Sequence, residues 1–423
     1  MIHKSIKRTV ATKLPMLYGL GRYFKKRFVL PLRREMVRMK AKQSKLHVDP
    51  YAMQFISPFT IKNTIYGPAD VPNPAAVSGM IKGGNWDRNT LSIMDLDIVR
   101  AARDRFKNNM EWRDTEYYKN HLDRILKGDY WRGCKTTDDL DAYCLRFDEL
   151  YYSIKNHGYI PESSILRNKY GATGATEHEI TVHIDRNGHY LLCDGRHRFA
   201  IALVLGIKEI PVKACIRHAD WQTFCFEIMT VAKNNGGKVY APLTHPDLQS
   251  IPSAHGEERY RIIAEHVPIH QGDLLDIGAH WGYFCHLFED LGFNCYAVES
   301  SPENLYFLEK LRDAQDRRFP IIGQSIFAYK EKNTFDVVLA LNIFHHFLKT
   351  EAAYHSLIEF LNRIDMKMMF FEPHNTTDNQ MQSAYRNYSP EEFINFIFKH
   401  SCLKHCTQID KAKDGRSIYK MWK

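Results

Sequence analysis

Two glycines, Gly278 and Gly282, follow the acidic residue Asp276 at the end of a short apolar run. The run is typical of a buried strand, and the apolar spacing over residues 284–291 is typical of a helix. A glycine turn lets a ligand approach the backbone closely, and the helix after it presents free N–H groups and the positive end of its dipole. The pattern therefore predicts a ligand-binding turn between a strand and a helix.

Glu299, Asn342 and Glu372 each follow a later apolar run that is typical of a buried strand. Glu299 stands about 20 residues after the first strand, where an acid can accept hydrogen bonds from both hydroxyls of a ribose. Because strands and helices alternate here, we expect a parallel sheet with helices on both faces. Ligands bind outside the carboxyl ends of the strands in such sheets.

The set D-x-G-x-x-x-G, then V-E, then F-D-V-V-L-A-L-N resembles class I S-adenosylmethionine (SAM)-dependent methyltransferases over residues 255–423. The resemblance implies an α/β domain with a Rossmann-like seven-stranded sheet and SAM as the cofactor. It places the first acid and the glycines along the methionine and ribose side, and the residue after the fourth strand near the sulfonium. The residues that it implies for SAM are Asp276, Gly278, Gly282, Glu299, Gln324, Ser325 and Asn342.

Two features depart from the pattern of that family. His280 and Trp281 are bulkier than the small residues that are usual in the glycine turn. An acid commonly follows the third strand to bind the adenine amine, whereas Gln324 and Ser325 stand there in this chain. An amide or a hydroxyl would therefore have to take that role. A nicotinamide-binding domain has similar spacing, but its G-x-G-x-x-G fingerprint is absent.

Two histidines, His345 and His346, follow the predicted fourth strand. Histidine titrates near neutral pH, so either is a candidate general base for a hydroxyl acceptor, and Glu372 is a further catalytic candidate. Alternatively, His345 packs or caps the next helix, and methyl transfer proceeds by in-line geometry without a base. We expect the acceptor to be an O or N nucleophile of a phosphorylated or nucleotide-linked small molecule or glycan.

A second glycine turn lies between a predicted hairpin and an apolar helix. A helix dipole, free N–H groups and two guanidinium groups at one place predict a phosphate or nucleotide site. The alternative is a structural ion-pair network of the charged members of the turn. The residues of this turn are Asp194, Gly195, Arg196, His197 and Arg198.

The run D-G-R-H-R-F-A-I-A, followed by L-G and I-P-V, resembles the ParB/sulfiredoxin-like fold, and we assign residues 159–235 to it. The resemblance implies a small α+β domain in which Gly195, His197 and Arg198 match a phosphate-contacting turn. The sulfiredoxin cysteine is replaced by Arg196, and no helix-turn-helix segment is evident afterwards. An alternative function for the whole chain is nucleotide binding or phosphotransfer here, beside an inactive or SAM-sensing methyltransferase fold.

Basic residues are concentrated at the start of the chain. Residues 1–45 hold 14 Lys or Arg and one acid, Glu35, although the whole chain has a net charge of only +9. Mixed with apolar residues, they predict a basic amphipathic helical arm for an anionic membrane surface or an acidic partner. Nucleic acid is less expected, because the signatures of base methylation, D/N-P-P-Y or a nucleophilic Cys, are missing.

The remaining features set the general class of protein. Residues 46–158 are expected to be a mostly helical region of unknown role. Within it, residues 46–90 are expected to form an ordered loop region with a few short strands, such as one at 59–62, and residues 91–158 to be helical. The chain has no apolar run of ~18 residues and no secretory leader pattern. Nine cysteines are scattered without C-x-x-C spacing. We therefore expect a cytoplasmic protein without a metal site, peripheral to the inner membrane surface through its arm.

Overall fold

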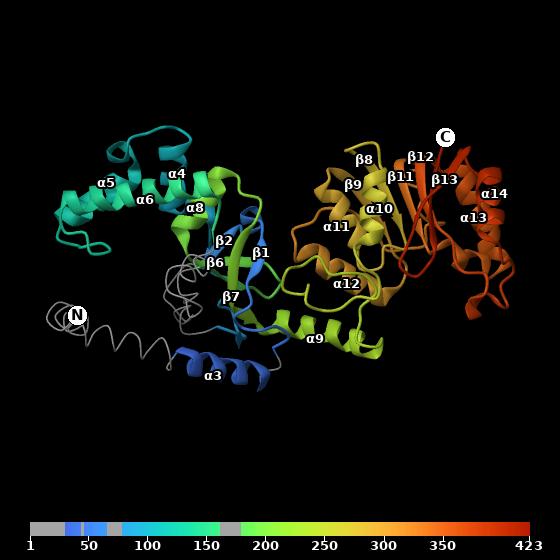
Figure 1. Cartoon of the computed structure of the whole chain (residues 1–423), viewed down its shortest axis with the longest axis horizontal. Helices are drawn as coiled ribbons and strands as arrows, with labels where there is room; N and C mark the ends of the chain where they lie inside the picture. The colour runs from blue at the N-terminus through green and yellow to red at the C-terminus, as the bar shows by residue number, and fades with distance from the viewer. Residues whose placement is uncertain (1–29, 44–45, 66–77, 161–178) are drawn as a thin grey trace. The chain divides into compact units, whose positions relative to one another are not determined.

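The computed structural model describes residues 30–43, 46–65, 78–160 and 179–423. The chain divides into two compact units, residues 1–227 and residues 228–423, each of which we describe by itself. Of the predicted arm, residues 1–29, 44 and 45 lie outside the described part, and helix α3 (Leu30–Gln43) is the part that is described (Figure 1).

A mixed seven-stranded sheet forms the centre of the first unit. Its order is β1-β7-β5-β6-β2-β4, and β3 also pairs with β7. The two central strands, β5 and β7, are buried along their whole length. The strands are β1 (Gln54–Ile56), β2 (Asn63–Ile65), β3 (Met80–Lys82), β4 (Thr90–Ser92), β5 (Ile180–Ile184), β6 (Tyr190–Asp194) and β7 (Ile210–His218).

The first part of residues 46–158 holds short strands, as expected for residues 46–90, and they belong to the central sheet of the unit. Strands β1 and β3 pair with β7, β2 pairs with β6, and β4 pairs with β2. The strand expected at 59–62 is wrong, because Pro58–Thr60 is a 3-10 turn and the strand begins at Asn63. The later part is helical, as the apolar spacing predicts. The helices of this unit are α4 (Asp97–Phe106), α5 (Glu116–Leu126), α6 (Thr137–His157) and α8 (Arg196–Leu205).

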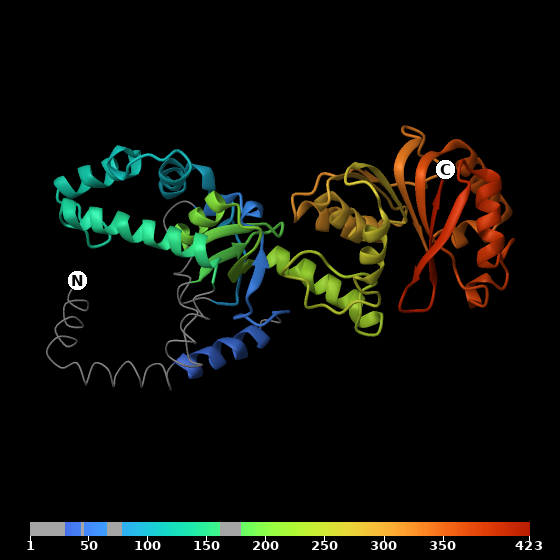
Figure 2. The ribbon, with the colours of Figure 1, turned by 45° about the horizontal axis from the view of Figure 1, so that its top comes forward.

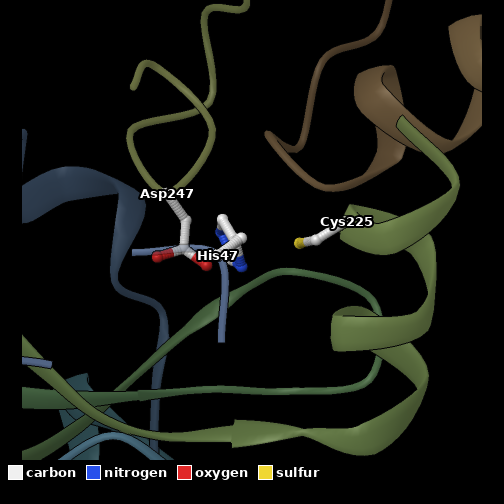
Figure 3. Close-up of side chains that lie close together, drawn as sticks. All are labelled: His47, Cys225 and Asp247. Carbon is white, nitrogen blue, oxygen red and sulfur yellow. The ribbon is translucent and has the colours of Figure 1, made fainter. Parts of the chain in front are cut away.

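Helix α9 (Ala219–Asn234) follows β7. Cys225 on this helix is buried, and its side chain points toward His47 (Figure 3). His47, which comes shortly after α3, lies with its Nδ1 3.3 Å from Oε1 of Gln222 on the same helix. This contact ties the segment before β1 to α9 within the first unit.

The second unit is built on another seven-stranded sheet, in the order β10-β9-β8-β11-β12-β14-β13. The first five are parallel, and β14 is antiparallel to both of its neighbours. The α/β class is confirmed, and the sheet is consistent with a Rossmann-like methyltransferase fold. The strands are β8 (Gly272–Ile277), β9 (Phe293–Val298), β10 (Ile321–Ile322), β11 (Thr334–Leu341), β12 (Asp365–Glu372), β13 (His405–Lys411) and β14 (Ser417–Trp422).

Helices cover both faces of this sheet (Figures 1 and 2). One apolar core joins the sheet to α13 and α14, and a second joins its other face to α10, α11 and α12. The burial of both faces explains why the apolar residues of β8 and β11 are consecutive, at Leu274 and Leu275 and over residues 337–341. Within the described ranges, no helix is long and apolar enough to cross a membrane. The helices are α10 (Glu258–His266), α11 (Tyr283–Asp290), α12 (Pro302–Asp313), α13 (Glu351–Arg363) and α14 (Pro390–His400).

Candidate functional site

The carboxyl ends of β8, β9 and β11 and the residues just after β10 line one cavity of about 480 Å³ in the second unit. This volume lies within the usual range for a small-molecule site. Most of the residues that the sequence marks as candidates line it. They are Asp276, Gly278, Glu299, Gln324, Ser325, Asn342 and His346. The structure does not place Gly282, His345 or Glu372 on the cavity surface.

The glycine turn owes its shape to backbone conformations that other residues adopt only with strain. Gly278 has φ 78° and Gly282, the N-cap of α11, has φ 82°. A Cβ on Gly278 would lie 2.7 Å from Cδ1 of Ile343, and one on Gly282 would lie 2.6 Å from Cδ1 of Leu308. His280 between them also has a positive φ, 53°. The turn therefore needs both glycines, whereas Gly282 shapes the cavity without lining it.

Glu299 presents a carboxylate that backbone groups hold in place. Its Oε2 accepts a hydrogen bond from the N–H of His280 at 3.0 Å. Its Oε1 accepts from the N–H groups of Ser300 and Ser301, at 2.9 and 2.8 Å. An ionised carboxylate has about four acceptor positions, so one remains for a ligand hydroxyl.

Asp276 lies at the end of β8 and is almost completely buried. The Sγ–H of Cys285 donates to its Oδ2 at 3.8 Å, which is a weak contact. Burial, which removes hydration from the charged form, and to a smaller extent the nearby Glu299 together raise the pKa of the Asp276 carboxyl to about 7. A ligand ammonium group would restore a partner to the ionised form.

Six buried polar atoms of residues that line the cavity have no hydrogen-bond partner in the described part of the chain. They are Nε of Arg259, Nε1 of Trp281, the hydroxyl of Tyr283, both ring nitrogens of His286 and Oδ1 of Asn342. Buried polar groups are normally paired, so these atoms indicate space for a polar ligand. Trp281 stacks on His280 with ring centroids 5.1 Å apart, which accounts for the two bulky residues in the turn.

Arg259 on α10 also lines the cavity. Its Nη2 donates to Oε1 of Glu372 at 2.7 Å and to Oδ2 of Asp414 at 2.9 Å. Glu372 also faces Arg416, with 3.4 Å between Nη1 and Oε1. Burial raises the pKa of the Glu372 carboxyl to about 7, while the two arginines oppose the shift. Because its carboxylate lies off the cavity surface, its position favours holding Arg259 over catalysis.

The two histidines of the 3-10 helix Phe344–Leu348 have different surroundings. His346 lines the cavity, and its Nδ1 accepts from Nζ of Lys349 at 3.3 Å. His345 is only 2% exposed and packs near His374, with ring centroids 5.7 Å apart. Burial lowers the pKa of both histidines, that of His345 to about 3. Of the pair, only His346 can therefore meet a ligand in the cavity.

Sequence reasoning missed the loop at residues 240–244, which lines the same cavity. Tyr240 packs against His280 with ring centroids 5.1 Å apart. The side-chain amide of Gln315 donates to Oγ1 of Thr244 at 3.0 Å. The loop precedes the first strand of the sheet and contains no motif, so the sequence gives no signal for it. Arg259 and Tyr283 were missed as well, although Tyr283 directly follows Gly282.

The second predicted turn lies in the first unit. Gly195 has φ 83°, and a Cβ there would lie 2.8 Å from Cα of Ile180, so the position requires glycine. Arg196 and His197 line a hollow of about 100 Å³, whose wall also includes Arg132 and Asp97. Two arginines, Arg196 at the start of α8 and Arg132 from the loop between α5 and α6, make this hollow a candidate anion site.

The other members of this turn have different positions. Asp194 is exposed, and its Oδ1 accepts from the N–H of Gly195 at 2.8 Å. Arg198 faces the buried Glu179, with 3.7 Å between Nη1 and Oε2. His197 forms a hydrogen bond through Nε2 with the hydroxyl of Tyr143, and burial lowers its pKa to about 4. The ion-pair alternative therefore fits Arg198, whereas Arg196 faces the hollow.

The comparison with known protein families concerns the second unit. Residues 252–411 match the family described as a methyltransferase domain. A search of curated protein sequences gives no match. Among solved structures, the bifunctional kinase-methyltransferase WbdD is 15% identical, with a TM-score of 0.38, over 46% of this chain and 45% of that chain. This chain thus spans about half the length of WbdD.

Two smaller enzymes match a similar part of the chain. The N-methyltransferase NodS from Bradyrhizobium japonicum WM9 is 9% identical, with a TM-score of 0.32, over 39% of this chain and 93% of its own. The 1,6-didemethyltoxoflavin-N1-methyltransferase of Burkholderia thailandensis, solved with S-adenosylhomocysteine (SAH), is 17% identical, with a TM-score of 0.30. That match covers 38% of this chain and 73% of the other.

Residues 252–411 are therefore a SAM-dependent methyltransferase domain. The chain carries an enzyme unit of the methyltransferase class, and SAM is its cofactor. The family of the N-terminal unit is not identified by these comparisons.

Proposed function

We propose that SAM binds in the 480 Å³ cavity of the second unit and that the chain transfers its methyl group to an oxygen or nitrogen nucleophile. The observation that carries the proposal is the convergence of the strand ends on this cavity. Glu299 would accept a ribose hydroxyl at its remaining acceptor position, Gln324 and Ser325 would contact the adenine, and Asn342 would face the sulfonium. Asp276 would pair with the ammonium of the methionine part.

Other cavity groups fit the same ligand. Among the described residues that line the cavity, Arg259 is the one Arg or Lys, so we assign the carboxylate of the methionine part to it. Glu372 and Asp414 hold its guanidinium in place. The unpartnered atoms of Trp281 and Tyr283 would gain hydrogen bonds from a polar ligand.

Bound SAM supplies an activated methyl group, and the residues of this chain supply orientation. Neutral His346 carries its ring proton on Nε2, because Lys349 donates to Nδ1. His346 would therefore donate to the acceptor and orient it, as transfer by proximity requires. We assign His345 and Glu372 to positioning neighbouring residues of the site. We assign no proton transfer to Glu372.

The acceptor can be sought by measuring SAH formation from SAM. Small-molecule fractions of a cell extract are supplied to the purified chain, untreated or treated with a phosphatase. We propose a phosphorylated or nucleotide-linked acceptor, so the untreated fraction should support SAH formation and the treated fraction should not. Equal SAH formation in both would contradict a phosphorylated acceptor but leave methyl transfer intact. No SAH formation with any fraction would favour a SAM-sensing or inactive domain.

A second proposal concerns the hollow at the start of α8. We infer that Arg196 and Arg132 bind a phosphate group there, as the resemblance of the turn to the ParB-like fold implies. Arg196→Gln should weaken binding of ATP, CTP or inorganic phosphate about tenfold, whereas Lys208→Gln, an exposed control, should not. If Arg196→Gln and Lys208→Gln bind all three probes alike, the hollow is not an anion site.

The basic arm is a third proposal. We propose that residues 1–45 attach the chain to an anionic membrane surface or an acidic partner, because this stretch holds 14 of the chain's 58 Lys and Arg. Such attachment weakens as salt rises. Sedimentation with anionic vesicles that is insensitive to salt, or absent at low salt, would count against the membrane surface.

A further inference from the structure

A second large cavity, of about 430 Å³, lies in the first unit between the start of β2, the end of β4, α4 and the last turn of α8. It is separate from the hollow at the start of α8 and shares no lining residue with it. Neither the methyltransferase domain nor the phosphate proposal gives it a role. Its walls are mainly apolar and basic, with Asn63 and Ser92 as the neutral polar members.

The floor of the cavity is apolar. Ile61, Ile93 and Val99 line it and are each at most 5% exposed. At the mouth, Phe59 and Met94 are 48% and 50% exposed, which leaves large apolar side chains facing water. Burying such surface against an apolar ligand is favourable, so the floor and mouth suit an alkyl chain.

The rim of the cavity is basic. Arg100 and Arg103 on α4 and Lys107, the C-cap of this helix, follow one another at helical spacing, which places them along one face. Lys62 adds a fourth cation from the other wall. None of the described residues that line the cavity is acidic, and none of the four cations has an ion pair with a described carboxylate.

Arg105, on the same helix, differs from these four cations because it forms ion pairs. Its guanidinium lies 2.9 Å from Asp148 and 3.2 Å from Glu111. The cation that points away from the cavity is thus neutralised within the protein, whereas the cations at the cavity are not. An anion in the rim would neutralise them.

We propose that this cavity binds a single-chain anionic amphiphile, with its alkyl chain on the apolar floor and a phosphate or carboxylate head at the basic rim. A neutral apolar ligand would leave the four cations without a partner. A free phosphate would leave Phe59 and Met94 exposed. An amphiphile satisfies both walls at once. The site belongs to the first unit and does not depend on the proposed methyl transfer.

The test uses the full chain and decyl phosphate below the concentration at which it aggregates. Binding is measured by calorimetry beside hexyl phosphate, decyl maltoside and inorganic phosphate. Each methylene that leaves an apolar site weakens binding by about fourfold, so hexyl phosphate should bind about two orders of magnitude more weakly. Decyl maltoside and inorganic phosphate should each bind at least tenfold more weakly than decyl phosphate.

Variants locate the site. Arg100→Gln combined with Lys107→Gln should weaken decyl phosphate at least tenfold and leave decyl maltoside unchanged. Met94→Glu places a carboxylate at the mouth and should weaken decyl phosphate similarly. Lys119→Gln and Leu126→Glu, at exposed positions on α5 away from the cavity, are the matched controls and should change nothing.

Three results would overturn the proposal. One is that decyl phosphate fails to bind the unaltered chain. Another is that decyl maltoside binds as tightly as decyl phosphate, which would show that the anionic head group is not recognised, or that inorganic phosphate does, which would show that the alkyl chain is not recognised. The last is that the variants at Arg100, Lys107 and Met94 bind decyl phosphate as the controls do, which would place its site elsewhere.

Discussion

At the level of single residues, the ionised carboxylate of Asp276 is the form that we propose binds the ligand, but it destabilises the fold when no ligand is bound. Its folded-state pKa of about 7 lies above the ordinary value of 3.8. Its ionised form is therefore a cost to folding that is absent below about pH 4 and fully present above about pH 7. Without ligand, Asp276→Asn removes this cost while keeping the shape of the side chain.

We predict that Asp276→Asn raises the free energy of unfolding of the second unit at pH 8 by on the order of 2 to 4 kcal/mol. The gain should shrink toward zero near pH 4. Thermal and denaturant unfolding at the two pH values measure it. A variant that is less stable than the unaltered chain at pH 8 would show that Asp276 already has a stabilising partner there.

His346 and His345 differ in what they can do, and substitutions separate their roles. His346→Gln keeps an N–H donor close to the position of Nε2 and should keep methyl transfer within about tenfold. His346→Ala should lose more. If His346 were a general base, both substitutions would lose about 10²- to 10⁴-fold. Steady-state kcat for the two variants decides between orienting and base roles.

His345→Asn is the companion substitution. Because His345 is buried off the cavity, this change should lower stability and leave kcat nearly unchanged. A large loss of kcat at full occupancy of SAM, with an intact fold by circular dichroism, would contradict its assignment to positioning.

The sequence placed Asp276, Glu299 and Asn342 at the cavity because residues at the ends of parallel strands share one edge of the sheet. It could not choose between His345 and His346, because adjacent residues of a short helix point in different directions and only packing decides which faces the ligand. Glu372 also ends a strand, yet Arg259 and Arg416 fix its carboxylate off the cavity surface. Such partners are distant in sequence and leave no local pattern.

At the level of elements, the ligand site depends on the backbone conformation of the glycine turn. Gly278→Ala puts a Cβ at positive φ and within 2.7 Å of Ile343. The left-handed conformation alone costs about 1 to 2 kcal/mol. We predict that Gly278→Ala lowers the stability of the second unit by at least that amount and weakens SAH binding at least tenfold.

Gly323→Ala is the matched control for this substitution. It stands after β10 beside the cavity residue Gln324, with a φ outside the left-handed region, and a Cβ there would meet Leu305 at 3.4 Å. It should change SAH affinity by less than threefold. Calorimetry on both variants makes the comparison, and equal losses would show that the backbone conformation at Gly278 is not what matters.

Element length explains what the sequence did not predict. Strands β5, β6, β8, β9, β11 and β12 have five to eight residues and clear apolar patterns, and they were expected. Strands β1 to β4 have three residues each, which is too short for alternation to be visible. Their place in the sheet of the first unit depends on partners more than 100 residues away, such as the pairing of Asn63 with Leu191.

At the level of the whole molecule, the two units have separate cores. We therefore expect the cofactor to stabilise only the unit that binds it. A ligand at 100 times its dissociation constant stabilises the state that binds it by about 2.7 kcal/mol. We predict that SAH slows amide hydrogen exchange in the second unit, most around residues 276–284 and 298–301. Exchange in residues 78–160 should stay unchanged. Protection confined to the first unit would contradict the assignment of the cavity.

Calorimetric titration of SAH into the full chain and into Glu299→Gln tests whether the cofactor binds at the carboxyl ends of the strands of the second unit. This substitution keeps the size of the side chain but removes the charge that we assign to a ribose hydroxyl. A hydrogen bond to a charged group contributes about 1.5 to 3 kcal/mol, so we predict that affinity falls about 10- to 100-fold. Glu303→Gln, on the exposed first turn of α12, is the control and should bind SAH like the unaltered chain. If Glu299→Gln binds SAH as tightly as the control does, the cofactor is not bound at the carboxyl ends of these strands.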